Sequence, residues 1–197
     1  MDAAGGLLLT LGLGVGLSAA CGFRVFVPLF LVGVAARAGH IELPTSFGWV
    51  EGNFALSCLG AATLCEVLAY YVPWFDNLLD TVATPAAAVA GTVMMMGMAG
   101  EMSPALKWAL GIIAGGGSAT LVQMGTVALR GASSLSTGGL GNSLVATGET
   151  AASLGMVLLA VLAPVLAMIA AVVVFVLAIC FLRKLVVRRA QYPSAGV

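Results

Sequence analysis

The chain has 197 residues, of which 61% are hydrophobic and 8% are charged, and its formal net charge is +0. A soluble domain carries about 25% charged residues, so this composition excludes a water-soluble globular protein. The zero net charge gives no electrostatic footprint for nucleic acid, so the expected partner is the lipid bilayer. At about 20 apolar residues per span, we predict an all-α, polytopic transmembrane helix bundle of five to six spans. Residues 1–190 form this single domain, and 191–197 form a short C-terminal tail.

The first apolar segment, residues 6–36, is too long for one ordinary span. As a single helix it would measure roughly 45 Å, against a hydrocarbon core of about 30 Å. We therefore expect it to tilt, protrude or break, and Gly22–Arg24 and Pro28 offer places for a break. Gly12 and Gly16 form a GxxxG pair, which lets another helix approach closely.

A polar connection, residues 37–53, leads into a second predicted span at 54–73. Aromatic residues close this span and mark the membrane boundary. Asp76 and Asp80 follow, four residues apart, and would share one face of a short helix. One interpretation is an interfacial amphipathic turn. The other is a carboxylate pair at a pore mouth, or one that holds a cation.

Two further spans are predicted at residues 86–100 and 105–129. The first is short for a crossing unless its helix extends back through Thr84. The second contains three consecutive glycines at 115–117, which predict a kink or very tight packing.

A minor alternative for these two spans is copper transport. Met94 and Met98, followed by Gly111 and Gly115, give an MxxxM and GxxxG spacing similar to that of the high-affinity copper transporters. Thioethers suit Cu(I), and Met94, Met98 and Met102 would stack along one helix face. The rest of the chain does not follow that family.

Residues 131–149 form the longest stretch that is not an apolar run, a Gly/Ser/Thr-rich connection before the last span. Its glycines and hydroxyls would let backbone groups point inward as a nest or ring, although a plain exposed loop has the same composition. The last run, residues 150–182, is again overlong. Pro164 near its middle predicts a kink or a projecting helix end.

The basic residues Arg183, Lys184, Arg188 and Arg189 follow the last span and predict a cytoplasmic C-terminus. Five spans then place the N-terminus outside, with Arg37 and Lys107 inside and only Arg130 outside. The 131–149 connection would lie opposite the C-terminus. Six spans would reverse the N-terminus.

Three ionisable residues, Arg24, Glu66 and Glu149, fall inside predicted spans, where charges are costly. The simplest interpretation is an ion pair between Arg24 and Glu66 that joins two helices without any transport. The alternative is that all three line a polar path, with breaks at Gly22–Arg24 and at 138–142 presenting helix ends to a solute.

Three pieces of the chain carry a family resemblance: residues 18–29; Glu66 with Asp76, Asp80 and Thr84–Pro85; and residues 136–143 with Glu149. Together they resemble a family of bacterial integral membrane proteins catalogued as domain of unknown function 4126. The chain departs from that pattern at Ser143, where proline is expected, and at Thr150, where a second acid is expected. The resemblance implies a multi-pass protein of the bacterial inner membrane and no particular activity.

No nucleophile–base pair, phosphate loop or metal-ligand set is visible in the sequence, so we expect neither an enzyme nor a cofactor nor a metal site. The leading hypothesis is a small oligomeric channel or transporter for an ion or small solute. The alternative is a structural or assembly subunit of a larger membrane complex that packs through its GxxxG faces. The predicted path residues are Arg24, Glu66, Asp76, Asp80, Thr137, Gly138, Gly139, Gly141, Asn142 and Glu149.

Overall fold

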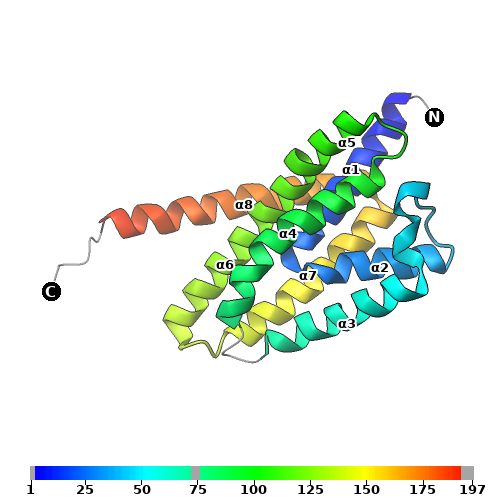
Figure 1. The fold of residues 1–197 in the computed structure, drawn as a ribbon. Coiled ribbons are helices and arrows are strands. Elements are labelled where there is room, and N and C mark those ends of the chain that lie inside the picture. Colours follow the sequence, from blue (N-terminus) through cyan, green and yellow to red (C-terminus); the bar gives the residue numbers. More distant parts are fainter. Residues whose placement is uncertain (1–2, 72–75, 192–197) are drawn as a thin grey trace.

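The computed structural model describes residues 3–71 and 76–191, and side chains for 5–71 and 79–184. The elements are α1 (Ala3–Phe23), α2 (Phe26–Arg37), the 3-10 helix η1 (Thr45–Glu51), α3 (Asn53–Ala69), α4 (Asp76–Met98), α5 (Pro104–Leu110), the π-helical turn η2 (Gly111–Gly116), α6 (Gly117–Thr137), α7 (Asn142–Leu162) and α8 (Pro164–Gln191). In this part of the chain α1, α4, α5–η2–α6, α7 and α8 are long and apolar enough to cross a membrane. The bent pair η1–α3, with an angle of 62°, would make a sixth span. These elements pack as a helix bundle (Figure 1), which confirms the predicted fold class.

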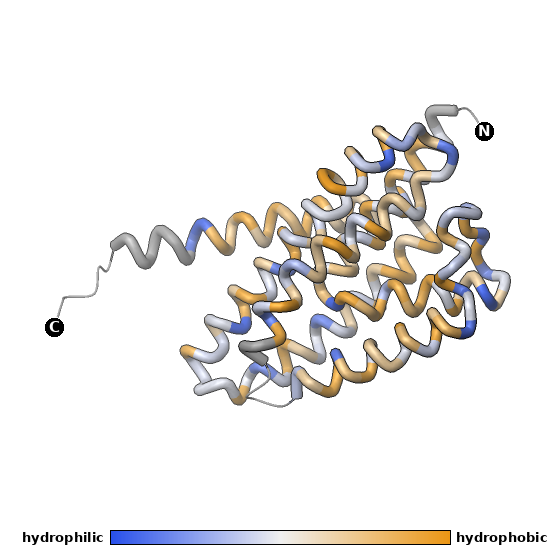
Figure 2. The backbone as a smooth tube through the Cα atoms, viewed as in Figure 1, coloured by the Kyte–Doolittle hydropathy of each residue, from blue (hydrophilic) through white to orange (hydrophobic). Residues whose placement is uncertain are grey.

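The helices are hydrophobic along most of their length, and hydrophilic residues gather at their ends and at a few interior positions (Figure 2). Large apolar side chains face outward, as at Leu64, Ile113 and Leu162, which are 65%, 76% and 80% exposed. A helix that is apolar all round needs an apolar environment on every side. The outer surface is therefore suited to lipid.

The first apolar segment breaks where the sequence predicted. α1 ends at Phe23, and α2 begins at Phe26 and runs back toward the end at which α1 starts (Figure 1). Pro28 explains the position, because in a continuous helix its ring would clash with the carbonyl of Arg24, four residues earlier. The α1–α2 pair is thus a hairpin, and its turn lies inside the bundle with Arg24 only 1% exposed.

The charged segment after residue 75 is not a separate short helix. It forms the first turns of α4, which continues through Pro85 to Met98. This 23-residue helix is about 34 Å long at 1.5 Å per residue. The predicted span at 86–100 therefore does extend back through Thr84.

The three glycines at 115–117 lie at the junction of η2 and α6, and Gly115 and Gly116 allow a very close contact with α4. A Cβ atom on Gly91 of α4 would lie 2.6 Å from the carbonyl oxygen of Gly115. Such a distance leaves no room for a side chain, so α4 and η2 touch backbone to backbone. The predicted tight packing is confirmed.

The Gly/Ser/Thr-rich connection is shorter than predicted, because residues 131–137 complete α6 and residues 142–149 begin α7. The α6 hydroxyls bond back to the helix, as from Thr137 Oγ1 to the carbonyl of Ser133 (2.8 Å), which satisfies them without a loop. Only residues 138–141 form the turn. Gly138 and Gly139 have φ values of 64° and 93°, in the left-handed region that glycine adopts without strain.

The last apolar run is two helices rather than one kinked helix. α7 ends at Leu162, and α8 starts at Pro164 and returns along α6, where a Cβ on Gly125 would lie 3.0 Å from the Cβ of Ala178. The turn at 138–141 and the C-terminal end of α8 therefore lie at the same end of the bundle (Figure 1), and the prediction that they are opposite is wrong. A proline can either bend or end a helix, and here it ends one. The predicted tail lies outside the described residues except for Gln191.

Both GxxxG pairs are used inside the chain. A Cβ on Gly12 would lie 2.6 Å from the carbonyl oxygen of Pro164, and one on Gly16 would lie 2.8 Å from the Cβ of Ala167. Gly111 likewise packs against α4, at the side chain of Met96. These glycines hold α1 against α8 and η2 against α4.

Candidate functional site

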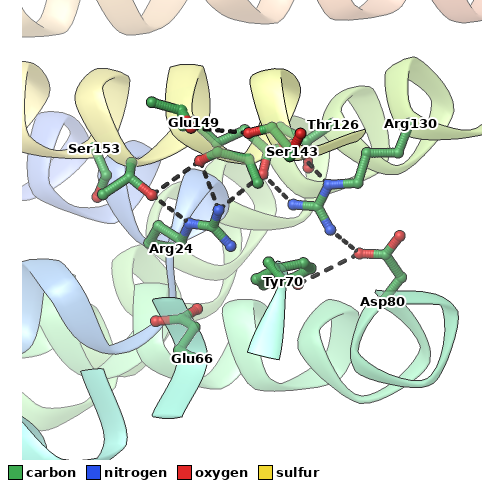
Figure 3. Close-up of polar contacts among 12 residues, drawn as sticks. Arg24, Glu66, Tyr70, Asp80, Thr126, Arg130, Ser143, Glu149 and Ser153 are labelled. Atoms are coloured by element: carbon green, nitrogen blue, oxygen red, sulfur yellow. Dashed lines mark hydrogen bonds and ion pairs between the residues drawn. The ribbon is translucent and has the colours of Figure 1, made fainter. Parts of the chain in front are cut away.

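Arg24 lies at the α1–α2 turn and points toward α7 (Figure 3). Its Nε donates to Thr150 Oγ1 (3.0 Å) and its Nη2 donates to the carbonyl of Ala146 (2.7 Å). Nη2 is also 3.5 Å from Glu149 Oε2. The remaining nitrogen, Nη1, is buried and has no hydrogen-bond acceptor.

Arg130, in α6, is the second guanidinium of the site and is 2% exposed. Its Nε donates to Glu149 Oε1 (3.1 Å), and its Nη2 donates to Glu149 Oε2. Its Nη1 donates to Asp80 Oδ1 of α4. Oxygen Oε2 of Glu149 is therefore paired with both arginines.

Tyr70 follows α3 and joins the two arginines. The centre of its ring is 4.1 Å from the Cζ atom of Arg24 and 3.9 Å from that of Arg130. Its hydroxyl donates to Asp80 Oδ1 at 3.3 Å. Guanidinium groups at this distance from an aromatic ring are attracted by its π electrons. We call Arg24, Tyr70, Asp80, Arg130 and Glu149 the buried charge cluster.

Glu66 is beside this cluster but has another role. Its two carboxylate oxygens accept the backbone amides of Val25 (2.6 Å) and Phe26 (3.0 Å), at the start of α2. The first amides of a helix have no partner within it and carry the positive end of the helix dipole. A carboxylate from α3 therefore caps α2 inside the bundle.

The predicted ion pair between Arg24 and Glu66 is wrong. Glu66 of α3 reaches the hairpin turn, but its carboxylate accepts backbone amides there, and the carboxylate paired with Arg24 is Glu149. A broken helix exposes amides that compete with side chains for any nearby carboxylate. Opposite charge alone did not identify the partner.

Of the two aspartates predicted as a pair, Asp80 belongs to the cluster. Asp76 is the first residue of α4, and its side chain lies outside the described residues. The predicted carboxylate pair with Asp76 therefore stays a prediction.

The glycine-rich residues of the predicted path are not brought to the cluster. Thr137 accepts the amide of Gly141 (2.9 Å) within the turn, and Asn142 Nδ2 donates to Ser134 Oγ (2.9 Å). Gly138 and Gly139 form the turn itself, at one end of the bundle (Figure 1). Glu149 follows about two helical turns later in α7, so the glycines do not form a ring or nest around the charges.

Three residues of the site were not identified from the sequence: Arg130, Tyr70 and Thr150. The predicted span ended at residue 129, directly before Arg130. However, no proline lies between residues 117 and 137, so the helical pattern gave no reason to end the helix at Leu129. Tyr70 was assigned to the membrane boundary, whereas it is 4% exposed and packs against both arginines.

Two pockets flank the cluster. One, of about 290 Å³, lies between α4 and α6 and is lined by Asp80, Thr81, Val127, Arg130 and Gly131. The other, of about 430 Å³, lies between α3 and α4, where Glu66 and Tyr70 are its polar lining residues among apolar ones. Tyr70 lines the second pocket and contacts Asp80 and Arg130, which line the first. These contacts connect the linings of the two pockets.

The described side chains also test the predicted methionine row. Met94 and Met98 are 0% and 6% exposed and belong to the apolar core, while Met102 lies beyond the end of α4 at Met98. The three do not share one helix face, so this prediction is wrong. Among the described residues, no three His, Cys, Asp or Glu side chains lie close enough together to hold a metal ion.

Comparison with known proteins gives one match. The family model described as Domain of unknown function (DUF4126) matches residues 11–184, a range that includes every residue of the buried charge cluster. No curated protein and no solved structure matches the chain. The protein therefore belongs to the DUF4126 family of domains of unknown function.

Proposed function

We propose that this protein is a membrane carrier that moves a small solute or ion across the bilayer, with the buried charge cluster as its substrate site. The observation that carries the proposal is the position of the buried charge cluster. Its four charged side chains meet inside the bundle beside the α1–α2 turn, and two pockets adjoin them.

The cost of these charges supports a role beyond folding. Each charged residue in a span costs about 2.5–3.5 kcal/mol on insertion scales, and such residues usually mark substrate or ion pathways. The bundle already has an apolar core, in which Leu17, Val32 and Met94 are fully buried. Apolar side chains would hold α1, α6 and α7 together without the desolvation cost of charged groups.

The α1–α2 hairpin supports transport in the same way. Broken helices inside a membrane are tolerated where their ends are buried in protein or face water, and transporters use them to present helix ends to solutes. Here the positive end of α2 lies inside the bundle at Val25, next to Arg24, and is capped by Glu66. A carrier suits this arrangement better than an open pore, since Tyr70, which lines one pocket, contacts Asp80 and Arg130, which line the other.

For localisation, we propose a cell membrane with the C-terminus on the cytoplasmic side. Arg183 and Lys184 are exposed in α8, and Arg188 and Arg189 follow in the same helix. Arg37 and Lys107 lie at the opposite end of the bundle, in α2 and α5 (Figure 1). Arg130 is interior and is not counted. Four basic residues then lie at the C-terminal end of the bundle and two at the other end, which favours the C-terminal end as the cytoplasmic side.

The competing function is that of a structural or assembly subunit of a larger complex. The sequence supported this function through its GxxxG pairs, which could pack against another subunit. In the structure both pairs contact helices of the same chain. The described contacts therefore favour transport over scaffolding.

An osmotic assay tests the proposal. Liposomes containing the purified protein are transferred into potassium acetate, potassium nitrate, potassium chloride, ammonium chloride or glycerol, and re-swelling is followed by light scattering. We expect re-swelling that is faster than in protein-free liposomes for at least one of these solutes. Valinomycin and a protonophore are added to the potassium salts, so that neither charge movement nor proton accumulation limits anion entry.

The matched variants are a neutral double change in the cluster, Arg130→Gln with Glu149→Gln, and the exposed change Arg37→Gln. The double variant is expected to reconstitute but to lose transport, and Arg37→Gln to keep it. Wild-type transport in the double variant would refute the proposal, as would a wild-type protein that passes none of these solutes.

A further inference from the structure

The carboxylate of Glu149 is held as a protein holds an anionic ligand. Arg130 contacts both of its oxygens, through Nε and Nη2, and Arg24 Nη2 approaches Oε2 from the other side at 3.5 Å. Two-point contacts between arginine and a carboxylate are the strong, geometrically specific form of this interaction. The site is therefore already shaped for a small planar anion.

One donor of this site is not used. Arg24 is 1% exposed, and its buried Nη1 has no acceptor. A buried donor without a partner costs about 1–3 kcal/mol. The oxygen of a second anion would satisfy it, and Nη1 belongs to the guanidinium that lies 4.1 Å from the ring of Tyr70.

A pocket reaches Arg130, the arginine on one side of this site. The pocket of about 290 Å³ between α4 and α6 reaches Arg130 and Asp80. Its other lining residues, Thr81, Val127 and Gly131, are small or aliphatic. An ion that enters here meets a guanidinium and a carboxylate together.

Charge balance decides what enters with the anion. The cluster contains two cations, Arg24 and Arg130, and two anions, Asp80 and Glu149, so its charges sum to zero. Glu66 adds one more carboxylate nearby, facing the amides at the positive end of α2. An extra anion alone would leave a buried net negative charge, which is unfavourable. One proton on Glu149 removes that charge and frees both arginines for the incoming anion.

We propose, on the basis of the carrier function above, that the substrate is a small monovalent oxyanion of the carboxylate or nitrate type. It binds between Arg24 and Arg130 in place of the Glu149 carboxylate, and Glu149 takes up one proton as it binds. The groups that face this exchange are Arg24 from the hairpin turn, Arg130 from α6, Asp80 from α4, and Tyr70 and Glu66 from the α3 region. Anion and proton move together, so each transport event carries no net charge.

Binding is measured on the full-length protein in detergent, with nitrate as the probe because it stays ionised at every pH used. Calorimetric titrations are made over a series of pH values. Uptake of one proton per anion predicts that the nitrate affinity rises up to tenfold for each unit by which the pH falls, in the range where free Glu149 is ionised. Acetate at neutral pH tests whether carboxylates share the site.

Variants separate the parts of the proposal. Glu149→Gln is permanently neutral at this position and is expected to bind nitrate with an affinity that no longer depends on pH. Arg24→Gln is expected to weaken binding more than tenfold, and Arg24→Lys, which keeps the charge, to recover part of it. Glu51→Gln, at an exposed position on η1, keeps the wild-type pH dependence.

Several outcomes would overturn the inference: wild-type nitrate affinity that does not change with pH, loss of nitrate binding in Glu149→Gln, or binding of cations alone. Because the titration needs no membrane, it is independent of transport. Nitrate binding without any flux in liposomes would refute the carrier function and support the anion site. Flux of a cation without nitrate binding would support the carrier function and refute the anion site.

Discussion

Arg130 and Glu149, nineteen residues apart, form a two-point contact between α6 and α7 in the interior of the bundle. The contact joins the two helices that flank the turn at 138–141, and it is the centre of the cluster that also holds Arg24 and Asp80. Neither partner faces solvent, since Arg130 is 2% exposed and Glu149 is 4% exposed.

The first prediction concerns this pair. Arg130→Gln or Glu149→Gln alone leaves a buried charge without its main partner, so each is expected to lower the free energy of unfolding by about 3–5 kcal/mol. The double change leaves two neutral amides and should recover at least half of that loss. Unfolding by SDS in mixed micelles, in a buffer without nitrate or carboxylates, gives the four values of a double-mutant cycle.

The surface control is Arg37→Gln, which removes the exposed hydrogen bond to Asn53. It should change the free energy of unfolding by no more than about 0.5 kcal/mol. Additive effects of the two single cluster changes would show that Arg130 and Glu149 do not interact in the folded protein.

The second prediction concerns the cap that Glu66 provides for α2. Glu66→Ala leaves the buried amides of Val25 and Phe26 without acceptors, and we expect a loss of about 3 kcal/mol. Glu66→Gln keeps one acceptor oxygen and should cost about 1 kcal/mol. Amide hydrogen exchange at Val25 and Phe26, measured by NMR, should accelerate in the order wild type, Gln, Ala.

The matched control is the exposed acid Glu51, for which Glu51→Ala should leave exchange at both amides unchanged. Unchanged exchange in Glu66→Ala itself would contradict the assignment of Glu66 as the cap.

The third prediction separates the ring of Tyr70 from its hydroxyl. Tyr70→Phe removes the 3.3 Å hydrogen bond to Asp80 but keeps the ring beside both guanidiniums, and should cost no more than about 1 kcal/mol. Tyr70→Leu removes the ring as well, and with two desolvated cation–π contacts worth up to about 2 kcal/mol each, the loss should exceed that of Phe by at least about 2 kcal/mol. Equal losses in the two variants would show that the ring contributes nothing to holding the arginines.

The fourth prediction concerns the backbone contact between α4 and η2. Gly91→Ala places a Cβ 2.6 Å from both the carbonyl oxygen of Gly115 and the Cβ of Ala119, which forces the helices apart and should cost about 1–3 kcal/mol. Gly155→Ala, in α7, meets nothing within 4 Å and should stabilise the protein by up to about 1 kcal/mol through helix propensity. SDS unfolding compares the two directly, and the same sign for both would refute the close contact.

The fifth prediction concerns topology. In a cysteine-free background, Leu140→Cys in the turn and a tag fused after Val197 should be reached by membrane-impermeant reagents from the same side, because α7 and α8 are antiparallel. His40→Cys, exposed between α2 and η1, should be reached from the opposite side. Labelling of Leu140→Cys from the side opposite the tag would contradict two antiparallel helices. It would favour instead a single kinked helix for residues 142–191.

Some features of the fold follow from local rules in the sequence. The break between α1 and α2 follows from the length of the apolar run and from Pro28, and the close contact with α4 follows from Gly115 and Gly116. Pro164 was less decisive, because a proline can bend or end a helix, and the choice depends on whether α8 finds partners along α1 and α6.

The site was harder to predict. Arg24 and Glu149 were recognised as charges inside spans, but the sequence does not say which of several carboxylates meets a given arginine. Glu66 was paired with Arg24 by charge, whereas backbone amides freed by the hairpin turn claim its carboxylate. Arg130 was missed because a single charge after a long apolar run is easily taken for the end of the span.

The cap of α2 has a consequence for how the chain is made. The amides of Val25 and Phe26 are synthesised about forty residues before Glu66, and Arg24 is synthesised 126 residues before Thr150, its hydrogen-bond partner in α7. The hairpin therefore enters the membrane with its turn unsatisfied and its arginine unneutralised. Truncation before residue 142 therefore keeps the cap from Glu66 but leaves Arg24 without its partners in α7.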